Sequence, residues 1–381
     1  MTWSVGFVPV NDHGRALGES ALRVLAGLGY PVAVTEFDLG PRRYLKTGDL
    51  IAEDEFEQLS RMDALFVGAP PVGGAEAPRG LLERGIIFKI RFGLDLFVNL
   101  RRFTGEGAVD IAVVRENTEG AYIGEGGVLR PGTPYAIATQ GSVTTAFGVE
   151  RCVRYAFALA RARRNRITLV HKISVLEYAG SIWHETFERL SRQHQDVEPA
   201  YVDVDTACIQ LVEDPGRFDV IVTDNLFGDI VSDVAGAITG ALSRSGSADL
   251  NPERITPSLF EPLHATAASL RHRPVDHVDP RGAYAAVVLL LDHFGEHGAA
   301  SRLARAVYVV GADESRTTAR TEAIVLELCE RAADRLAVQL RLAVLSDLTS
   351  RTPSSAIVVA ISDSSTVSTS STPTRPAAAS P

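Results

Sequence analysis

The sequence predicts an α/β protein built on a largely parallel sheet. Short apolar segments rich in β-branched residues alternate with longer segments whose apolar residues recur at helical spacing, which is typical of strands joined by crossover helices. The composition supports a large core, because 45% of the 381 residues are hydrophobic and 22% are charged. This length is compatible with one two-lobed unit or with two domains.

Each expected strand is a short apolar run bounded by polar or turn-forming residues. The expected strands cover residues 4–10, 31–37, 63–69, 110–115, 167–171, 199–204, 219–223 and the start of 258–267. Each expected helix has apolar residues three and four positions apart. The expected helices cover residues 16–28, 53–61, 146–164, 181–192, 282–293, 299–309 and 320–336, with a further helix from Phe227 onward.

The C-terminal residues differ in composition from the rest of the chain. From about Thr349 the sequence is rich in Ser, Thr, Pro and Ala and has no periodicity. Residues 349–381 are therefore expected to form a disordered tail, with residues 356–361 as an apolar exception.

Charge and cysteine content disfavour several kinds of partner. The net charge is −9, so nothing favours binding to nucleic acid or to an anionic membrane. No apolar run is long enough to span a bilayer, and the N-terminal residues do not resemble a secretory signal. Cys152, Cys208 and Cys329 are far apart, which disfavours a disulfide framework and a thiolate metal site. A cytoplasmic protein is expected.

Two aspartates on the helix that follows the strand 219–223 indicate a cation site. Asp229 and Asp233 stand at positions i and i+4, where like charges repel by roughly 0.2–0.5 kcal/mol on an exposed helix. A divalent cation would compensate this repulsion, and hard carboxylate oxygens suit Mg²⁺ or Mn²⁺. Taken alone, such a pair is more often a solvated helix face.

Basic residues near strand ends indicate an anionic substrate. Arg91 and Arg101 flank an apolar stretch, and Arg115 ends a predicted strand; a guanidinium group matches a carboxylate with two parallel hydrogen bonds. Lys172 ends another strand and would suit acid–base chemistry if its pKa were lowered. Asp205 stands where a helix is expected to begin, so it is an N-cap candidate. Each of these residues, taken singly, is more often structural or solvated.

No glycine-rich phosphate-binding turn opens the first helix. Gly14 is the only glycine in its first turn, so the G-x-G-x-x-G motif of a Rossmann nucleotide site is missing. Any nucleotide must be held by other means.

Several longer motifs follow one another in a specific order. They are IRFGLDLFVNLR, VVRENTEGAYIGEGG, LVHKISVL, the segment around Asp205, VTDNLFGDIVSD and LFEPLHATA. This order resembles the metal-dependent β-decarboxylating dehydrogenases, the isocitrate/isopropylmalate dehydrogenase family, over residues 4–336. The resemblance is closest to the isopropylmalate branch, and the isocitrate and tartrate branches are near rivals.

The resemblance implies a two-domain fold of the isopropylmalate dehydrogenase type, different from a Rossmann fold. Residues 1–93 and 246–340 would form a discontinuous nucleotide-side domain. Residues 94–245 would form a domain for substrate, metal and dimerisation.

The resemblance also implies roles for individual residues. Asp229 and Asp233 would bind Mg²⁺ or Mn²⁺ together with Asp205 from the second subunit of a homodimer. Lys172, from the same second subunit, would assist removal of the C2 hydroxyl proton, and Tyr122 would protonate the carbon left after decarboxylation. The implied substrate-binding residues are Arg91, Arg101 and Arg115 for the carboxylates and Ile87, Phe88 and Val175 for an alkyl group.

The nucleotide side departs from the family pattern. The implied cofactor-binding residues are Glu261, His264, Ala265, Thr266, Ala267 and Asp279. Ser269 stands where NAD-dependent members carry an aspartate for the adenine ribose, and Arg271 and Arg273 could hold a 2′-phosphate instead. NAD is the expected cofactor, while NADP and a weakened nucleotide site stay open.

The resemblance therefore predicts Mg²⁺- or Mn²⁺-dependent oxidative decarboxylation of 3-isopropylmalate or a related 3-alkylmalate, a small 2-hydroxy dicarboxylic acid, to the 2-oxo acid. An apolar pocket disfavours the third carboxylate of isocitrate, which would need a polar contact. The alternatives are a descendant that binds a dicarboxylate and metal without redox chemistry, and a tartrate- or isocitrate-type dehydrogenase that uses NADP.

Overall fold

The computed structural model describes residues 2–69, 80–107, 109–263, 274–311 and 316–350, together with two short strands at 359–360 and 368–369. The chain divides into two compact units, Met1–Glu330 and Arg331–Pro381. All candidate site residues lie in the first unit. None of the described helices has the length and apolar character needed to cross a membrane.

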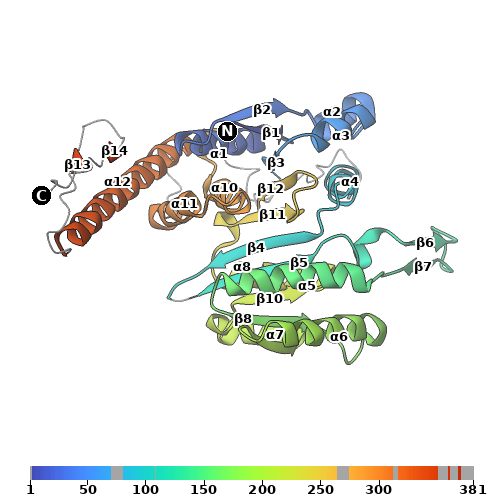
Figure 1. Cartoon of the computed structure of the whole chain (residues 1–381). Helices are drawn as coiled ribbons and strands as arrows, with labels where there is room; N and C mark the ends of the chain where they lie inside the picture. The colour runs from blue at the N-terminus through green and yellow to red at the C-terminus, as the bar shows by residue number, and fades with distance from the viewer. Residues whose placement is uncertain are drawn as a thin grey trace, which may run out of the picture. The chain divides into compact units, whose positions relative to one another are not determined.

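A ten-stranded sheet forms the centre of the first unit (Figure 1). Its order is β2-β1-β3-β12-β11-β4-β5-β10-β8-β9. The strands are β1 (Trp3–Val8), β2 (Val32–Glu36), β3 (Ala64–Val67), β4 (Val98–Thr104), β5 (Asp110–Glu116), β8 (Arg166–His171), β9 (Glu198–Asp203), β10 (Val220–Thr223), β11 (Gly246–Leu250) and β12 (Ser258–Pro262). Three pairs around β4 and β11 are antiparallel and the other six are parallel. The predicted α/β class with a largely parallel sheet is confirmed.

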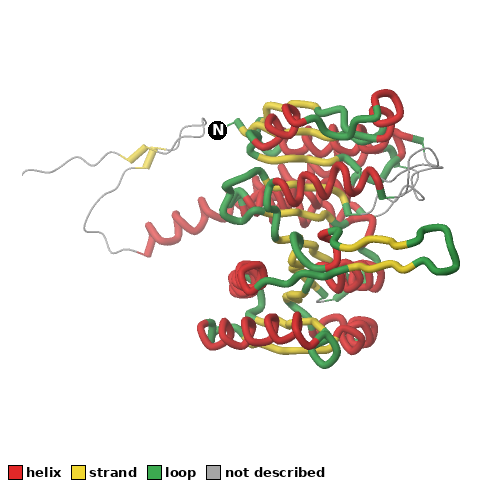
Figure 2. The backbone as a smooth tube through the Cα atoms, turned by 90° about the vertical axis from the view of Figure 1, so that its right-hand side faces the viewer, coloured by secondary structure: helices red, strands yellow, loops and turns green. Residues whose placement is uncertain are grey.

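Helices cover both faces of this sheet (Figures 1 and 2). The α-helices of the first unit are α1 (Asp12–Gly27), α2 (Pro41–Thr47), α3 (Glu53–Ser60), α4 (Lys89–Gly93), α5 (Ala146–Arg161), α6 (Glu177–Gln193), α7 (Val204–Glu213), α8 (Asn225–Ile238), α10 (Arg281–His293) and α11 (His297–Val310). Shorter helical turns are η1 (Glu83–Phe88), η2 (Ala121–Ile123), η3 (Pro215–Arg217), η4 (Leu242–Arg244) and η5 (Val275–His277). A hairpin of β6 (Gly126–Leu129) and β7 (Ile137–Gln140) projects from the body.

Alternation along β5 determines which helices its side chains meet. Ala112 and Val114 pack in the apolar cluster that contains α5, α6, α10 and α11. Ile111 and Val113 pack in the cluster that contains α7 and α8. By the same alternation, the next odd-numbered residue, Arg115, faces α8.

The helix α8 begins earlier than the sequence predicts. Asp224 is its N-cap, and the Asp224 carboxylate accepts a hydrogen bond from the backbone N–H of Phe227 at 2.7 Å. The helix therefore starts at Asn225, directly after β10, and Asp229 and Asp233 both lie on it.

The expectation that Asp205 caps a helix is wrong. Helix α7 begins at Val204, with Asp203 in the N-cap position, so Asp205 lies inside the first turn. Its carboxylate accepts a hydrogen bond from Lys172 at 2.7 Å.

Every strand predicted from the sequence is present, but β4 and β11 of the sheet and the hairpin strands β6 and β7 were missed. Adjacent Arg101 and Arg102 interrupt the apolar pattern of β4, and Asp249 interrupts that of β11. These charged side chains find partners in the folded chain, so the two strands pair despite their weak local pattern.

The last helix, α12 (Thr318–Ser350), is longer than the predicted 320–336 and continues into the second unit. In the segment predicted as a tail, the described strands β13 (Val359–Ala360) and β14 (Ser368–Thr369) pair in antiparallel fashion. Disorder of the remaining tail residues stays a prediction, as does the division of the first unit into nucleotide-side and substrate-side domains.

Candidate active site

Asp229 of α8 lies at the centre of a cluster to which three other elements, β4, β5 and η2, contribute side chains. Its Oδ1 accepts a hydrogen bond from the Arg115 guanidinium at 2.5 Å, and its Oδ2 accepts one from the Tyr122 hydroxyl at 2.9 Å. Arg101 lies 3.5 Å from the same carboxylate. Burial alone would raise the Asp229 pKa, but Arg115 and Arg101 outweigh burial and lower this pKa.

Arg115 is held rigidly at the end of β5. Its side chain is 2% exposed, and its Nε and a terminal nitrogen both donate to Asn225 Oδ1, at 2.9 and 2.6 Å. A Cβ at Gly228 would come within 2.6 Å of the Arg115 side chain, so the helix can approach only because glycine stands there. Burial lowers the Arg115 pKa to about 10, which leaves the group charged at neutral pH.

Arg101 links the cluster to the second aspartate of α8. It donates to Ser232 Oγ at 2.7 Å and lies 3.5 Å from Asp233 Oδ1. Its Nε is buried without a hydrogen-bond partner among the described residues. The two aspartate side chains keep 39% and 51% of their surface exposed, so each offers a carboxylate to a ligand.

Arg91 stands next to this cluster but pairs with a residue that the sequence did not indicate. Its guanidinium donates to Asp249 Oδ2 at 3.1 Å, and both side chains are buried. The Arg91 guanidinium also lies 5.3 Å from the Phe88 ring, which in turn meets the Tyr122 ring at 5.8 Å. Phe88 therefore connects Arg91 to the Tyr122 edge of the cluster.

Phe88 and Ile87 lie on η1, a π-helical turn. Such turns are rare and occur often at functional sites. Ile87 is buried in an apolar cluster, and Phe88 is partly buried against it. Val175, the third implied alkyl contact, is 69% exposed in the single chain.

Lys172 and Asp205 form a second, separate cluster. Lys172 Nζ donates to Asp205 Oδ1 at 2.7 Å and to Asp203 Oδ2 at 3.0 Å. These hydrogen bonds raise the Lys172 pKa, so a lone chain does not supply the lowered pKa that an acid–base role would need. Asp205 is 66% exposed. Lys172 donates its described hydrogen bonds to Asp203 and Asp205, whereas Asp229 accepts its hydrogen bonds from Tyr122 and Arg115. The two clusters therefore share no hydrogen bond among the described residues.

A single chain does not assemble a complete cation site from its described residues. No three His, Cys, Asp or Glu side chains among them gather in an arrangement that could hold a metal ion. The predicted ligands Asp229 and Asp233 lie together on α8, and Asp205 lies with Lys172.

The structure describes only two of the six residues that the family resemblance implies as nucleotide-binding. His264, Ala265, Thr266 and Ala267 lie outside the described residues. Glu261 lies in β12, and the Asp279 carboxylate is bound by the buried Arg281 guanidinium at 2.7–3.1 Å.

Glu116 is a buried carboxylate next to the site that sequence reasoning missed. It is 2% exposed and accepts hydrogen bonds from Thr118 N, Thr118 Oγ1 and Glu119 N at 2.7–3.1 Å. It thereby holds the loop that leads to Tyr122. Burial raises the Glu116 pKa from its ordinary value of 4.5 to about 7. No local sequence signal distinguishes it from an exposed glutamate.

We expect Glu116 to make stability depend on pH. In the unfolded chain the Glu116 carboxyl loses its proton near its ordinary pKa of 4.5, whereas in the folded chain it keeps the proton up to a pH of about 7. The free energy of unfolding should therefore fall across this window, by about 3 kcal/mol from this group. Urea unfolding of wild type and Glu116→Gln at both ends of the window measures the difference. Equal pH slopes in the two proteins would contradict the assignment.

Comparisons with known proteins agree with the geometry. The family model described as isocitrate/isopropylmalate dehydrogenase matches residues 4–326. The chain is 44% identical over 310 residues to 3-isopropylmalate dehydrogenase of Rhodococcus opacus (strain B4), covering 79% of this chain and 91% of that protein. It is 44% identical over 304 residues to the protein of the same name in Mycobacterium tuberculosis (strain ATCC 25618 / H37Rv), covering 77% of this chain and 89% of that protein.

Solved structures lead to the same family. The crystal structure of isocitrate dehydrogenase from Methylococcus capsulatus superimposes with a TM-score of 0.77 at 28% identity, covering 86% of this chain and 99% of that chain. The match of the family model extends over most of the chain and includes the Asp229 and Lys172 clusters. The chain therefore belongs to the isocitrate/isopropylmalate dehydrogenase family and is an oxidoreductase.

Proposed function

We propose that this protein oxidises and decarboxylates 3-isopropylmalate, or a closely related 3-alkylmalate, to the corresponding 2-oxo acid with NAD as the electron acceptor. The observation that carries the proposal is the convergence of Arg101, Arg115 and Tyr122 on Asp229. Guanidinium groups of this kind bind carboxylates, and an apolar wall beside them suits an alkyl substituent. The names of the relatives support the same substrate class.

Tyr122 fits the role of a proton donor in this reaction. Burial raises its pKa and the negative charge of Asp229 raises it further, so the hydroxyl keeps its proton at neutral pH. The Arg115 guanidinium lies 5.1 Å from the Tyr122 ring and helps to fix its position. A hydroxyl held in this way can deliver a proton to the carbon from which CO₂ has departed.

The α8 aspartates fit a divalent cation. Asp229 and Asp233 are hard oxygen donors on one helix face, each still partly exposed. Asp205 of a second copy would complete the ligand set. When bound, the cation would polarise the C2 oxygen of the substrate, and the nicotinamide would accept the hydride.

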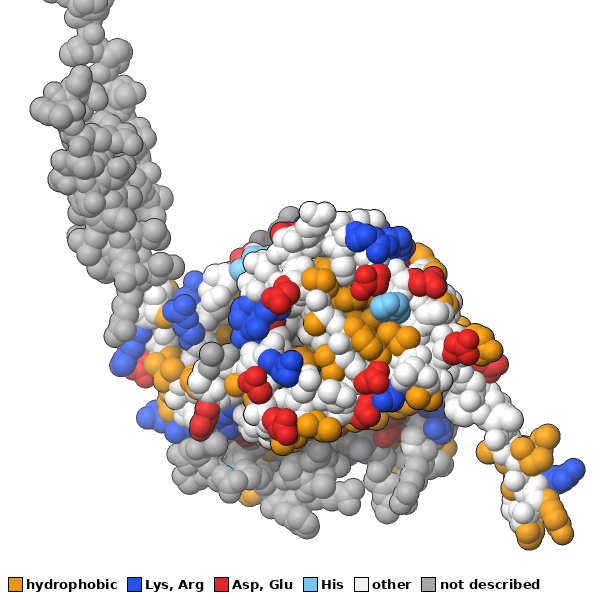
Figure 3. Space-filling view, turned by 90° about the horizontal axis from the view of Figure 1, so that it is seen from below, with side chains coloured by type: hydrophobic (Ala, Val, Ile, Leu, Met, Phe, Trp, Pro, Cys, Tyr) orange, Lys and Arg blue, Asp and Glu red, His pale blue; other side chains and the backbone are white. Residues whose placement is uncertain are grey.

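A homodimer with shared sites would unite the two clusters. Apolar side chains gather on the face seen in Figure 3, and exposed apolar residues of α7 and α8 are available for a partner. These residues are Ile209, Val212, Leu226 and Ile230, which are 41–65% exposed. A two-fold pairing would bury them and would bring Lys172 and Asp205 of each copy to the Asp229 cluster of the other.

NAD is the nucleotide that we propose as the cofactor. The alternatives are NADP and a site with weakened nucleotide binding. Calorimetric titration with both nucleotides decides among these three. We also retain the nucleotide-side domain of residues 1–93 and 246–340, the substrate-side domain of residues 94–245, and a cytoplasmic location as predictions.

An absorbance assay for reduced nicotinamide tests the main proposal. We expect NADH to form with 3-isopropylmalate, to stop after removal of divalent cations with EDTA, and to return on addition of Mg²⁺ or Mn²⁺. Isocitrate and tartrate, tested with both nucleotides, are the comparison substrates. If no 3-alkylmalate, isocitrate or tartrate yields reduced nucleotide, the redox proposal fails. A metal-dependent dicarboxylate-binding descendant would then be favoured.

Phe88 should limit the size of the 3-substituent. In Phe88→Leu the wall beside Tyr122 recedes, and we expect the ratio of kcat/KM for a bulkier 3-alkylmalate over 3-isopropylmalate to rise about tenfold. Phe56→Leu is the matched control, because Phe56 packs on the same apolar cluster but contacts Lys89 instead of Tyr122. The same ratio in both variants would show that Phe88 does not shape the pocket.

A further inference from the structure

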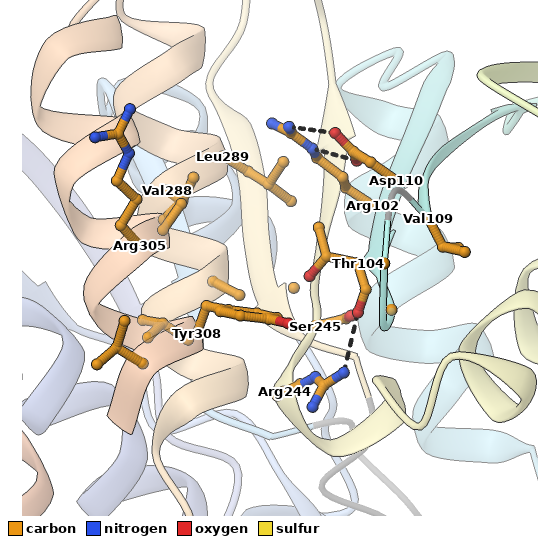
Figure 4. Close-up of a pocket in the computed structure, with 17 residues that line it drawn as sticks. Arg102, Thr104, Val109, Asp110, Arg244, Ser245, Val288, Leu289, Arg305 and Tyr308 are labelled. Atoms are coloured by element: carbon orange, nitrogen blue, oxygen red, sulfur yellow. Dashed lines mark hydrogen bonds and ion pairs between the residues drawn. The ribbon is translucent and has the colours of Figure 1, made fainter. Parts of the chain in front are cut away.

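A cavity of about 570 Å³ lies between the β4–β5 turn and the helices α10 and α11 (Figure 4). Its volume is within the range of small-molecule sites. Val288 and Leu289 of α10 form one wall, and Thr104 and Val109 flank the opposite one. Tyr308 of α11 extends across the cavity towards Ser245. None of these residues belongs to the active-site clusters.

The cavity lies on the other face of β4 from the Asp229 cluster. Consecutive residues of a strand point to opposite faces. Arg101 donates to Ser232 of α8, whereas its neighbour Arg102 lines the cavity with α10 and α11. A molecule in the cavity would therefore be separated from the Asp229 cluster by the thickness of the sheet.

The charged groups of the cavity leave an excess of positive charge. Asp110 is neutralised by Arg102, which binds both of its oxygens at 2.9–3.0 Å, and by Arg163 at 3.2 Å. Arg244 donates to the Thr104 carbonyl at 3.0 Å, but its Nε is buried without a partner among the described residues. Arg305 is exposed, and no hydrogen bond or ion pair of its side chain is found in the described part of the chain.

We propose that this cavity binds a small aliphatic carboxylate. The apolar side chains of α10 and α11 would surround the alkyl chain, and the Tyr308 ring would cover it. The carboxylate would be oriented by the guanidinium group of Arg244, because Asp110, the one acidic side chain among the described lining residues, is already paired with arginines. The ligand needs no hydroxyl group and no second carboxylate, which separates it chemically from the substrate proposed above.

Calorimetric titration of the full chain with sodium octanoate tests this site. We expect saturable binding with a dissociation constant on the order of 1 mM or below. Octan-1-amine has the same chain length and the opposite charge, and it should not bind. Absence of octanoate binding would overturn the proposal, and equal binding of the amine would overturn the assignment of a carboxylate.

Three variants locate the binding. Ala304→Phe fills the cavity from α11 and should weaken octanoate binding at least about tenfold. Arg244→Gln removes the guanidinium group that would orient the carboxylate and should weaken binding about fivefold. Arg320→Gln removes an exposed arginine outside the cavity and should change binding less than about twofold. Unchanged affinity in Ala304→Phe would place octanoate elsewhere on the protein and overturn the proposal, whether or not the dehydrogenase activity is found.

Discussion

Mixing a Tyr122→Phe chain with a Lys172→Ala chain is expected to restore roughly a quarter of wild-type activity, although each variant alone should lose at least about a hundredfold in kcat. In the structure the Tyr122 hydroxyl binds Asp229, whereas Lys172 binds Asp205 in a different cluster. If every site takes one cluster from each subunit, a mixed dimer contains one site with both changes and one site with neither. Random assortment makes half of the dimers mixed, and half of their sites are intact.

The measurement is turnover after the two variants are unfolded together and refolded, compared with each variant refolded alone. A control mixture of Tyr122→Phe with Asp229→Ala changes two residues of the same cluster. Every site in that mixture should carry one of the changes, so no activity should return. No recovery in the test mixture would show that Tyr122 and Lys172 of a site come from the same subunit. Recovery in the control would contradict the assignment of Tyr122 and Asp229 to one subunit.

Replacing Asp219 with alanine is expected to lower the free energy of unfolding by about 3–5 kcal/mol. The Asp219 side chain is fully buried. It accepts hydrogen bonds from Arg163 Nε at 2.8 Å and from the backbone N–H of Arg164 at 2.9 Å. Without the carboxylate, the buried Arg163 guanidinium keeps its contacts with Asp110 but loses its buried partner at 2.8 Å. The Arg164 backbone N–H loses its acceptor as well, and breaking a buried ion pair by removing one partner is strongly destabilising.

Urea unfolding monitored by circular dichroism measures this effect. Asp196→Ala is the matched control, because Asp196 also pairs with an arginine, Arg161, but at an exposed position. Exposed pairs contribute little, so the control should unfold close to wild type. Equal loss of stability in the two variants would mean that burial of Asp219 does not determine its contribution.

Much of the fold followed from local patterns. The strands β1, β2, β3, β5, β8, β9, β10 and β12 all lie where short apolar runs predicted them. The failures have a physical cause: Arg101 of β4 and Asp249 of β11 are charged residues whose hydrogen-bond partners lie far away in the sequence. Arg91 and Asp249, for example, are 158 positions apart, and no local pattern encodes such a contact.

In the candidate site, too, local patterns predicted some features and tertiary packing determined others. The spacing of Asp229 and Asp233 required that they share a helix face, and the motif order identified the arginines, Tyr122 and Lys172. The sequence did not indicate that Asn225 would hold Arg115 or that Glu116 would be buried with a raised pKa. Both depend on how α8 and the loop after β5 pack against the sheet.

The sequence by itself determined the α/β class, the pair of aspartates on one helix and the family, because periodicity and short motifs are properties of neighbouring residues. Only the tertiary structure decided which guanidinium meets which carboxylate and how the lysine cluster is separated from the Asp229 cluster. It also revealed the cavity behind β4. Burial and long-range distance arise when strands and helices pack, and they set both the strength of a charge pair and the pKa of a buried group.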